Sequence, residues 1–176
     1  ITQASIPLTL INPGGTDVSQ MCPSAVNTTT CYGGTVPGFQ LYEYVGLAVL
    51  QGQCSEVTVS WSNCCRNASN NVINGFSTNL YFDAKFENLN STGNNSSPDY
   101  SLLGIPYLAP SQTDQNSLGI FDADGDSLFV EFTDPMDSEF APVSWSPGFT
   151  TNTPFGPGSD IEQEYGSYSL STGIVG

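Results

Sequence analysis

The chain has 176 residues, with 17 acidic side chains against 2 basic ones and no histidine, so its net charge at pH 7 is −15. This charge excludes nucleic acid and anionic membrane surfaces as partners, because both require basic patches. The lack of histidine removes the commonest general base and leaves no Ser-His or Cys-His pair to propose. No apolar run approaches the length of a membrane span. We therefore expect a protein that is not an enzyme and has no membrane span.

The composition is typical of an all-β protein. The chain contains 18 Gly and 12 Pro, which mark frequent turns, and aromatic and β-branched residues fill the segments between them. No stretch keeps a 3.6-residue apolar period over three turns, so we expect almost no helix. The length fits one large β domain or two small ones. A chain that begins at Ile1 without Met is expected to be a mature product or a piece of something longer.

Alternating apolar residues predict the strands. The expected strands are, in chain order, residues 6–11, 40–50, 57–62, 76–89, 128–132, 143–145, 168–170 and 174–175. The second and third are expected to be antiparallel neighbours across the turn at residues 51–53, and the last two to flank a tight turn. An acidic turn is expected at residues 134–137, and Trp61 and Trp145 are expected in the core rather than on a ligand platform.

The five cysteines are typical of an oxidising, extracellular setting. The odd count leaves one thiol without a partner. A disulfide of short span could close the polar loop from Cys22 to Cys31, and adjacent residues on a strand point to opposite faces, so the last two cysteines are expected to bond elsewhere rather than to each other. The alternative is that the thiols are free and buried. The disulfide candidates are Cys22, Cys31, Cys54, Cys64 and Cys65.

An acidic loop, FDADGDSL, precedes the expected strand 128–132. It places Asp122, Asp124 and Asp126 on alternate positions, and Gly125 permits the backbone to turn between the last two. Oxygen-only ligands suit calcium, so the loop predicts a structural calcium site. The spacing is not that of an EF-hand, and the alternative is an Asx-rich turn with three solvated aspartates. The candidates to complete the coordination are Asp134, Asp137 and Glu43.

Four motifs in this order resemble a repeat module of very large surface proteins of Bacteroidota, over about residues 20 to 176. They are MCPSAVNTTTCYGGTVPGFQLYEYVG, TVSWSNCCRNAS, FDAKFENLN followed by NSSP, and GIPYLA followed by FDADGDSLFVEF. The DxDGDSL motif and the terminal LSTGIVG look like the cadherin-like and PKD-like β-sandwiches of bacterial adhesins. The resemblance implies one or two Ig-like or cadherin-like β-sandwich units with long loops. We expect a disulfide-bearing unit at residues 1–104 and a cadherin-like unit at residues 105–176.

The chain departs from this family in its cysteines and in its length. Relatives often carry a Cys before the NSSP motif, where this chain has Asn94, and two more in the segment that is residues 108–119 here. The first departure would leave Cys64 or Cys65 without a partner. Residues 106–176 fall short of a standard domain by about two strands, so we expect a neighbouring repeat or chain to supply them by β-augmentation.

The resemblance implies a secreted, cell-surface protein built as a long array. We expect a structural and adhesive repeat module of an extracellular filament or stalk, used for attachment, gliding or capture of other cells. Its partners would be copies of itself or neighbouring repeats, and cell-surface glycans or proteins. The alternative is a carbohydrate-binding module, which requires an exposed aromatic platform; a groove lined by Tyr107, Trp145 and Tyr165 would favour it.

Overall fold

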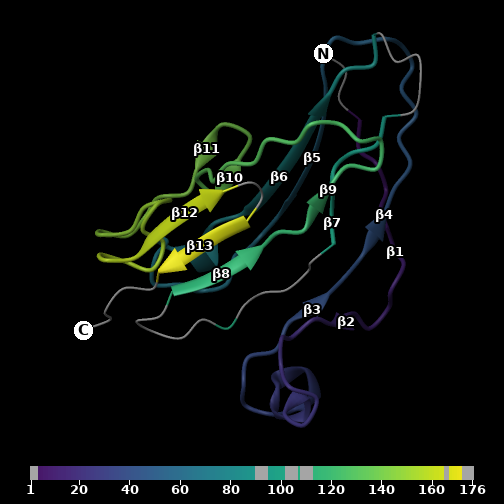
Figure 1. Ribbon diagram of the computed structural model, residues 1–176. Coiled ribbons are helices and arrows are strands. Elements are labelled where there is room, and N and C mark those ends of the chain that lie inside the picture. The colour runs from purple at the N-terminus through teal and green to yellow at the C-terminus, as the bar shows by residue number, and fades with distance from the viewer. Residues whose placement is uncertain (1–3, 90–94, 102–106, 108–112, 165–166, 172–176) are drawn as a thin grey trace. The chain divides into compact units, whose positions relative to one another are not determined.

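The computed structural model describes residues 4–89, 95–101, 107, 113–164 and 167–171 (Figure 1). The protein is all-β, as expected, and is built from small antiparallel sheets with little helix. Its 3₁₀ helices are η1 (Val26–Thr28), η2 (Thr30–Tyr32) and η3 (Gly75–Ser77). None of the helices in the described part of the chain is long and apolar enough to cross a bilayer. The chain divides into two compact units, residues 1–52 with 103–107 and residues 53–102 with 108–176.

The first unit contains two very short strand pairs. Its strands are β1 (Thr9–Leu10), which pairs with β4 (Tyr44–Val45), and β2 (Thr16–Asp17), which pairs with β3 (Gln40–Leu41). The long strand expected at residues 40–50 is therefore wrong. Asn12 explains the interruption, because its side chain donates to the Leu41 carbonyl at 2.9 Å and accepts the Glu43 amide at 2.7 Å.

A tight polar loop follows β2 in the first unit. Thr29 is completely buried, and its carbonyl accepts the amides of Tyr32 and Gly34. A Cβ on Gly34 would lie 2.0 Å from the Thr28 carbonyl oxygen, and a Cβ on Gly38 would lie 2.6 Å from the Cys31 sulfur. Both glycines are therefore required by close approach of the backbone to its neighbours. The loop folds through these contacts around a small polar centre rather than an apolar one.

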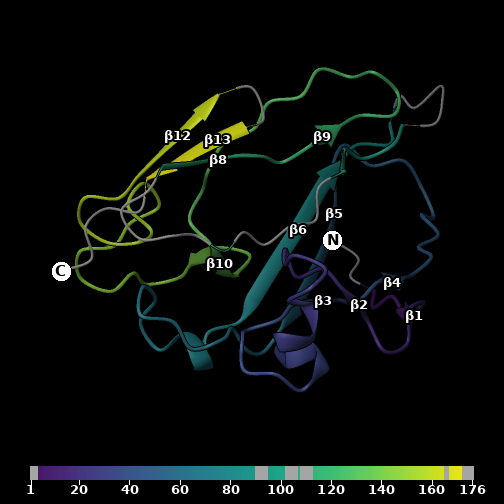
Figure 2. The same cartoon turned by 60° about the horizontal axis from the view of Figure 1, so that its bottom comes forward.

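The second unit contains a four-stranded sheet in the order β11-β10-β6-β5, of which Figure 2 labels β10, β6 and β5. The strands are β5 (Val57–Asn63), β6 (Leu80–Phe86), β10 (Met136–Ser138) and β11 (Ala141–Pro142). The first two pair along all seven residues, and Met136 pairs with Tyr81 on the other side of β6. Both long strands were expected from their alternation, whereas β10 falls where an acidic turn was expected.

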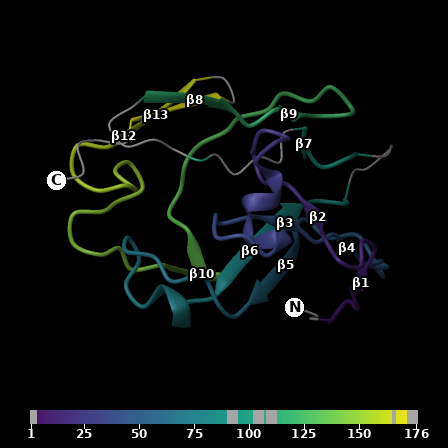
Figure 3. The ribbon, with the colours of Figure 1, turned by 90° about the horizontal axis from the view of Figure 1, so that it is seen from below.

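Two further sheets complete the second unit. Strand β7 (Asp99–Tyr100) pairs with β9 (Ile120–Phe121). The other sheet has three strands in the order β12-β13-β8, which Figure 3 shows together: β8 (Thr113–Ser117), β12 (Asp160–Glu164) and β13 (Ser167–Ser171). The expected strand 168–170 lies within β13, and residues 174–175 lie outside the described residues.

Two of the sequence-based expectations for the strands are corrected. Strand 57–62 pairs with residues 80–86 and not with 40–50, because its alternating apolar face continues only across β6. The strand expected at residues 128–132 is wrong, because alternation alone does not decide whether a segment becomes a strand. Pairing of β10 with β6 joins residues on both sides of the expected 104/105 boundary, and the compact units divide the chain at other positions.

The apolar interior among the described residues is small. Its buried side chains are Val72, Tyr81 and Val143, all in the second unit. The Val143 amide donates to the Pro135 carbonyl at 2.8 Å, which fixes the chain after β11. Val72 forms an isolated antiparallel bridge with Trp145, which is all that remains of the expected strand 143–145.

Candidate functional site

The β5–β6 pair has one largely apolar face. Directly opposed residues share a face of an antiparallel pair, so the register brings eight side chains together as four cross-strand pairs, the last of which is Asn63 opposite Leu80. We call the other three pairs the apolar face; its members are Val57 opposite Phe86, Val59 opposite Ala84, and Trp61 opposite Phe82. The opposite face carries Ser, Thr, Asp and Lys side chains and the buried Tyr81. The alternation of residues in β5 and β6 thus produces one largely apolar and one polar surface.

The apolar face is exposed. Trp61 is 40% exposed, Phe82 58% and Phe86 44%. The rings of Trp61 and Phe82 lie nearly parallel, with centroids 6.1 Å apart and planes 18° from each other. The expectation that Trp61 lies in the core is therefore wrong, because 40% of its surface is exposed on this face. A contiguous exposed patch of this kind marks an interaction surface more often than chance solvent contact.

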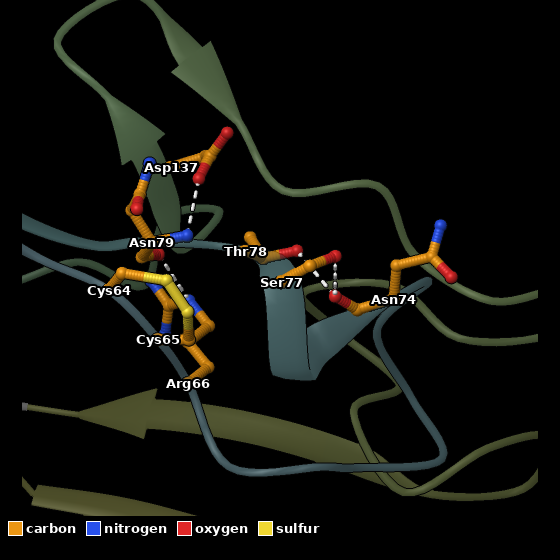
Figure 4. Close-up of a disulfide and its surroundings, with 8 residues drawn as sticks. All are labelled: Cys64, Cys65, Arg66, Asn74, Ser77, Thr78, Asn79 and Asp137. Carbon is orange, nitrogen blue, oxygen red and sulfur yellow. Dashed lines mark hydrogen bonds between the residues drawn. A yellow bond between two sulfur atoms is a disulfide. The ribbon is translucent and has the colours of Figure 1, made fainter.

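Arg66 fixes one end of the β5–β6 pair (Figure 4). Its guanidinium donates to the carbonyls of Asn79 at 3.0 Å and Met136 at 2.8 Å, and its amide donates to Thr78 at 2.9 Å. Asp137 accepts the Asn79 amide at 2.6 Å. One basic side chain thereby joins the end of β5, the start of β6 and β10. The sequence analysis counts Arg66 only as one of two basic residues; a single Arg shortly after an expected strand in so acidic a chain is the signal that indicates its role.

The other end of the pair is closed by Cys54 and Asn88. The Cys54 amide donates to the Asn88 side-chain oxygen at 2.5 Å, and the Asn88 amide donates to the Cys54 carbonyl at 3.1 Å. These bonds extend the ladder beyond Val57 and Phe86. The apolar face is therefore presented on a ribbon that is held at both ends, which is the rigid support that a binding surface requires.

The cysteines pair differently from the expectation. Cys64 and Cys65 are joined to each other by a disulfide (Figure 4), and Cys22, Cys31 and Cys54 are free thiols. Strand β5 ends at Asn63, so the two bonded cysteines lie beyond the strand, where the rule of opposite faces does not apply. The Cys22–Cys31 bridge is not formed. Cys22 and Cys54 are exposed, so the alternative of buried free thiols does not describe them either.

The acidic loop is organised by hydrogen bonds to Asp122. One oxygen of Asp122 accepts the amides of Asp124 at 2.8 Å and Asp126 at 3.1 Å, and Gly125 adopts a φ of 83°. The second carboxylate of the series, on Asp124, accepts the Ser96 amide at 2.6 Å. This arrangement is an Asx-type turn. The Asp126 carboxylate makes no hydrogen bond to a described residue, and its donor atoms are of the kind that calcium prefers.

Two of the three candidates to complete a calcium site use their carboxylates elsewhere. Asp134 accepts hydrogen bonds from the Thr151 hydroxyl and, at 2.9 Å, from the Trp145 indole, and these bonds hold its pKa below the ordinary value. Asp137 binds the Asn79 amide, and Glu43 belongs to the first unit. Within the described ranges no three acidic or cysteine side chains gather as metal ligands.

Of the three aromatic residues expected to line a groove, the structure describes Tyr107 and Trp145, each within its own unit. Tyr107 donates its hydroxyl to the Pro37 carbonyl and packs its ring 5.8 Å from Phe39, within the first unit. Trp145 is half-buried in the second unit, and Tyr165 lies outside the described residues. Among the described residues, the apolar face brings together three exposed aromatic side chains, Trp61, Phe82 and Phe86. Comparisons with protein-family models, with curated proteins and with solved structures found no match for this chain.

Proposed function

We propose that the chain is a structural and adhesive repeat module of a large secreted surface protein, which forms an extracellular filament or stalk. The observation that carries the proposal is the exposed apolar face on a ribbon held at both ends. A rigid, flat apolar surface gains free energy when a partner removes it from water, by about 25 cal/mol per Å². The module needs no catalytic group to hold a partner in this way.

The proposal includes an Ig-like or cadherin-like β-sandwich as the unit of the array. The all-β composition, the small antiparallel sheets and the resemblance to Bacteroidota surface modules support it. The net charge of −15 keeps long filaments soluble and apart. The Cys64–Cys65 disulfide is compatible with an oxidising exterior, where such bonds persist.

Adhesion is tested with beads that carry the purified chain. Under flow, wild-type beads should be retained on lawns of intact Bacteroidota cells, and the W61S/F82S double variant should reduce retention by about tenfold, because it removes the aromatic pair. The matched control is F140S, which removes a ring that is 82% exposed outside the apolar face. Equal retention of the wild type and the double variant would refute adhesion through this face.

The near-parallel Trp61–Phe82 pair also favours the carbohydrate-binding alternative. Exposed aromatic rings on a flat sheet are a platform on which the apolar face of a sugar ring can stack. The same bead experiment distinguishes the two functions when polysaccharide-coated glass is added as a second surface. If the beads are retained on polysaccharide and are no longer retained on cells stripped of their glycans, the function is carbohydrate binding rather than general adhesion.

A structural calcium ion at Asp122, Asp124 and Asp126 is part of the proposal. The informative variant is D126N, because that carboxylate is the one not used in the turn, whereas changing Asp122 would break the turn with or without metal. Calcium at about 100 times its dissociation constant should stabilise the wild type by about 2.7 kcal/mol relative to EDTA. D126N should abolish the shift and leave the melting temperature in EDTA unchanged. An identical melting temperature of the wild type in calcium and in EDTA would remove calcium.

A further inference from the structure

Strand β5 is an open edge of the four-stranded sheet. The order β11-β10-β6-β5 places it at the end, and its only ladder in the described part of the chain is the one to β6. Every residue from Thr58 to Asn63 is exposed. Half of the amides and carbonyls of such a strand point away from its neighbour, and they form a template for another strand.

The edge lacks the features by which proteins usually protect open edges. Its sequence, VTVSWSN, contains no charge, no Pro and no Gly, and its register with β6 runs through seven residues without a bulge. The opposite edge of the same sheet differs, because β11 is two residues long and ends in Pro142. Charged residues, Pro, bulges and short length are the usual means of blocking edge pairing. One edge is therefore blocked and the other is open.

The sequence of β5 is complementary to itself in the antiparallel direction. With Ser60 opposite Ser60 of a second copy, all seven residues pair. Val59 is then directly opposite Trp61 on one face of the sheet, and Thr58 is directly opposite Ser62 on the other face. Pairs of a β-branched with an aromatic side chain, and of Ser with Thr, are favourable across antiparallel strands. Glu56, the nearest acidic residue in the chain, would face Cys64, so no two carboxylates of the strands oppose each other.

We infer that β5 pairs with β5 of a second copy of this chain, about a two-fold axis at Ser60. The pairing joins two four-stranded sheets into one and makes their apolar faces continuous across the axis. An isologous contact of this kind closes on itself and gives a dimer, not an open fibre. The inference deepens the proposed function, because it names the partner of one edge of the module and rests on that proposal for its biological role. A net charge of −15 on each copy opposes the contact, so salt should strengthen it.

The test is sedimentation velocity of the purified chain from micromolar to millimolar concentration, at low and at high salt. The wild type should dimerise, more tightly at high salt. S60E should weaken the dimer by about tenfold or more, because Ser60 lies opposite Asp83 on β6 and the variant would line up four carboxylates across the joined sheets. An equimolar mixture of S60E and S60K should dimerise again. S24E, with the same charge change in the first unit, should dimerise like the wild type.

Hydrogen exchange on the wild type provides a second measurement that needs no variant. Amides of β5 that do not bond to β6 should become protected as the concentration rises, while those of β11 should not. A chain that stays monomeric at millimolar concentration and high salt would overturn the inference, as would S60E that dimerises as tightly as the wild type. Because no cells are involved, such a failure would leave the bead result, and with it the proposed adhesive function, unaffected.

Discussion

The β5–β6 ribbon and the first unit use opposite means to hold antiparallel strands. The ribbon pairs two seven-residue strands through an unbroken ladder and needs side chains only at its ends. The first unit has ladders of two residues each, and side chains such as Asn12 and Asp17 bond the backbone between them. Where the sequence alternates strictly, the strands are held by backbone-to-backbone hydrogen bonds. Where Gly, Pro and Asn interrupt the alternation, polar side chains form hydrogen bonds to the backbone instead.

This difference predicts that stability in the ribbon depends on its ends. Replacing Arg66 by Met removes two charge-assisted hydrogen bonds to the carbonyls of Asn79 and Met136 and leaves both acceptors without that donor. We expect the free energy of unfolding to fall by about 3 kcal/mol, measured by urea titration. K85M removes the other basic charge from an exposed position in β6 and should stay within about 0.5 kcal/mol of the wild type. Equal effects of the two variants would show that Arg66 acts only through its charge.

A smaller effect is expected in the first unit. N12A removes the part-buried hydrogen bond to the Leu41 carbonyl and the exposed one to the Glu43 amide. It should lower the free energy of unfolding by about 1 to 2 kcal/mol. Hydrogen exchange should show the loss as faster exchange of the Glu43 amide, with the β5–β6 amides unchanged. N27A, in η1, is the matched control and should leave that amide as protected as in the wild type. Loss of protection in β5 and β6 as well would mean that the two regions unfold together.

The sequence predicts the all-β class and both strands of the ribbon, because strict alternation over seven residues has no competing interpretation. It does not predict that these two strands pair with each other. Residues 40–50 alternate as well and are closer in the chain to residues 57–62, so they were the expected partner. The interruption there comes from Asn12, which is 31 residues from the Glu43 amide that it binds. Such a contact has no local signal in the sequence.

The candidate site was predicted even less completely. The positions of Phe82 and Phe86 on one face were recognisable, but periodicity does not tell a covered face from an exposed one. The Asp122 loop was predicted to turn at Gly125, and it does, with the bonds of an Asx-type turn. The adjacent cysteines were expected to bond elsewhere on the assumption that they lie on a strand, and β5 ends one residue before Cys64.

The two basic residues determine where proteases of the trypsin class can cut the protein. Proteases of the trypsin class cut after Lys and Arg, and this chain offers them only Lys85 and Arg66. Lys85 lies within a paired strand, and Arg66 is half-buried with its guanidinium bonded to two carbonyls. Cleavage requires the segment around the cut peptide bond to open locally. We therefore expect the peptide bonds after Lys85 and Arg66 to be cut only when the β5–β6 pair opens. The side chain that joins the strands is thus also one of the two places where such an enzyme could begin to digest the protein.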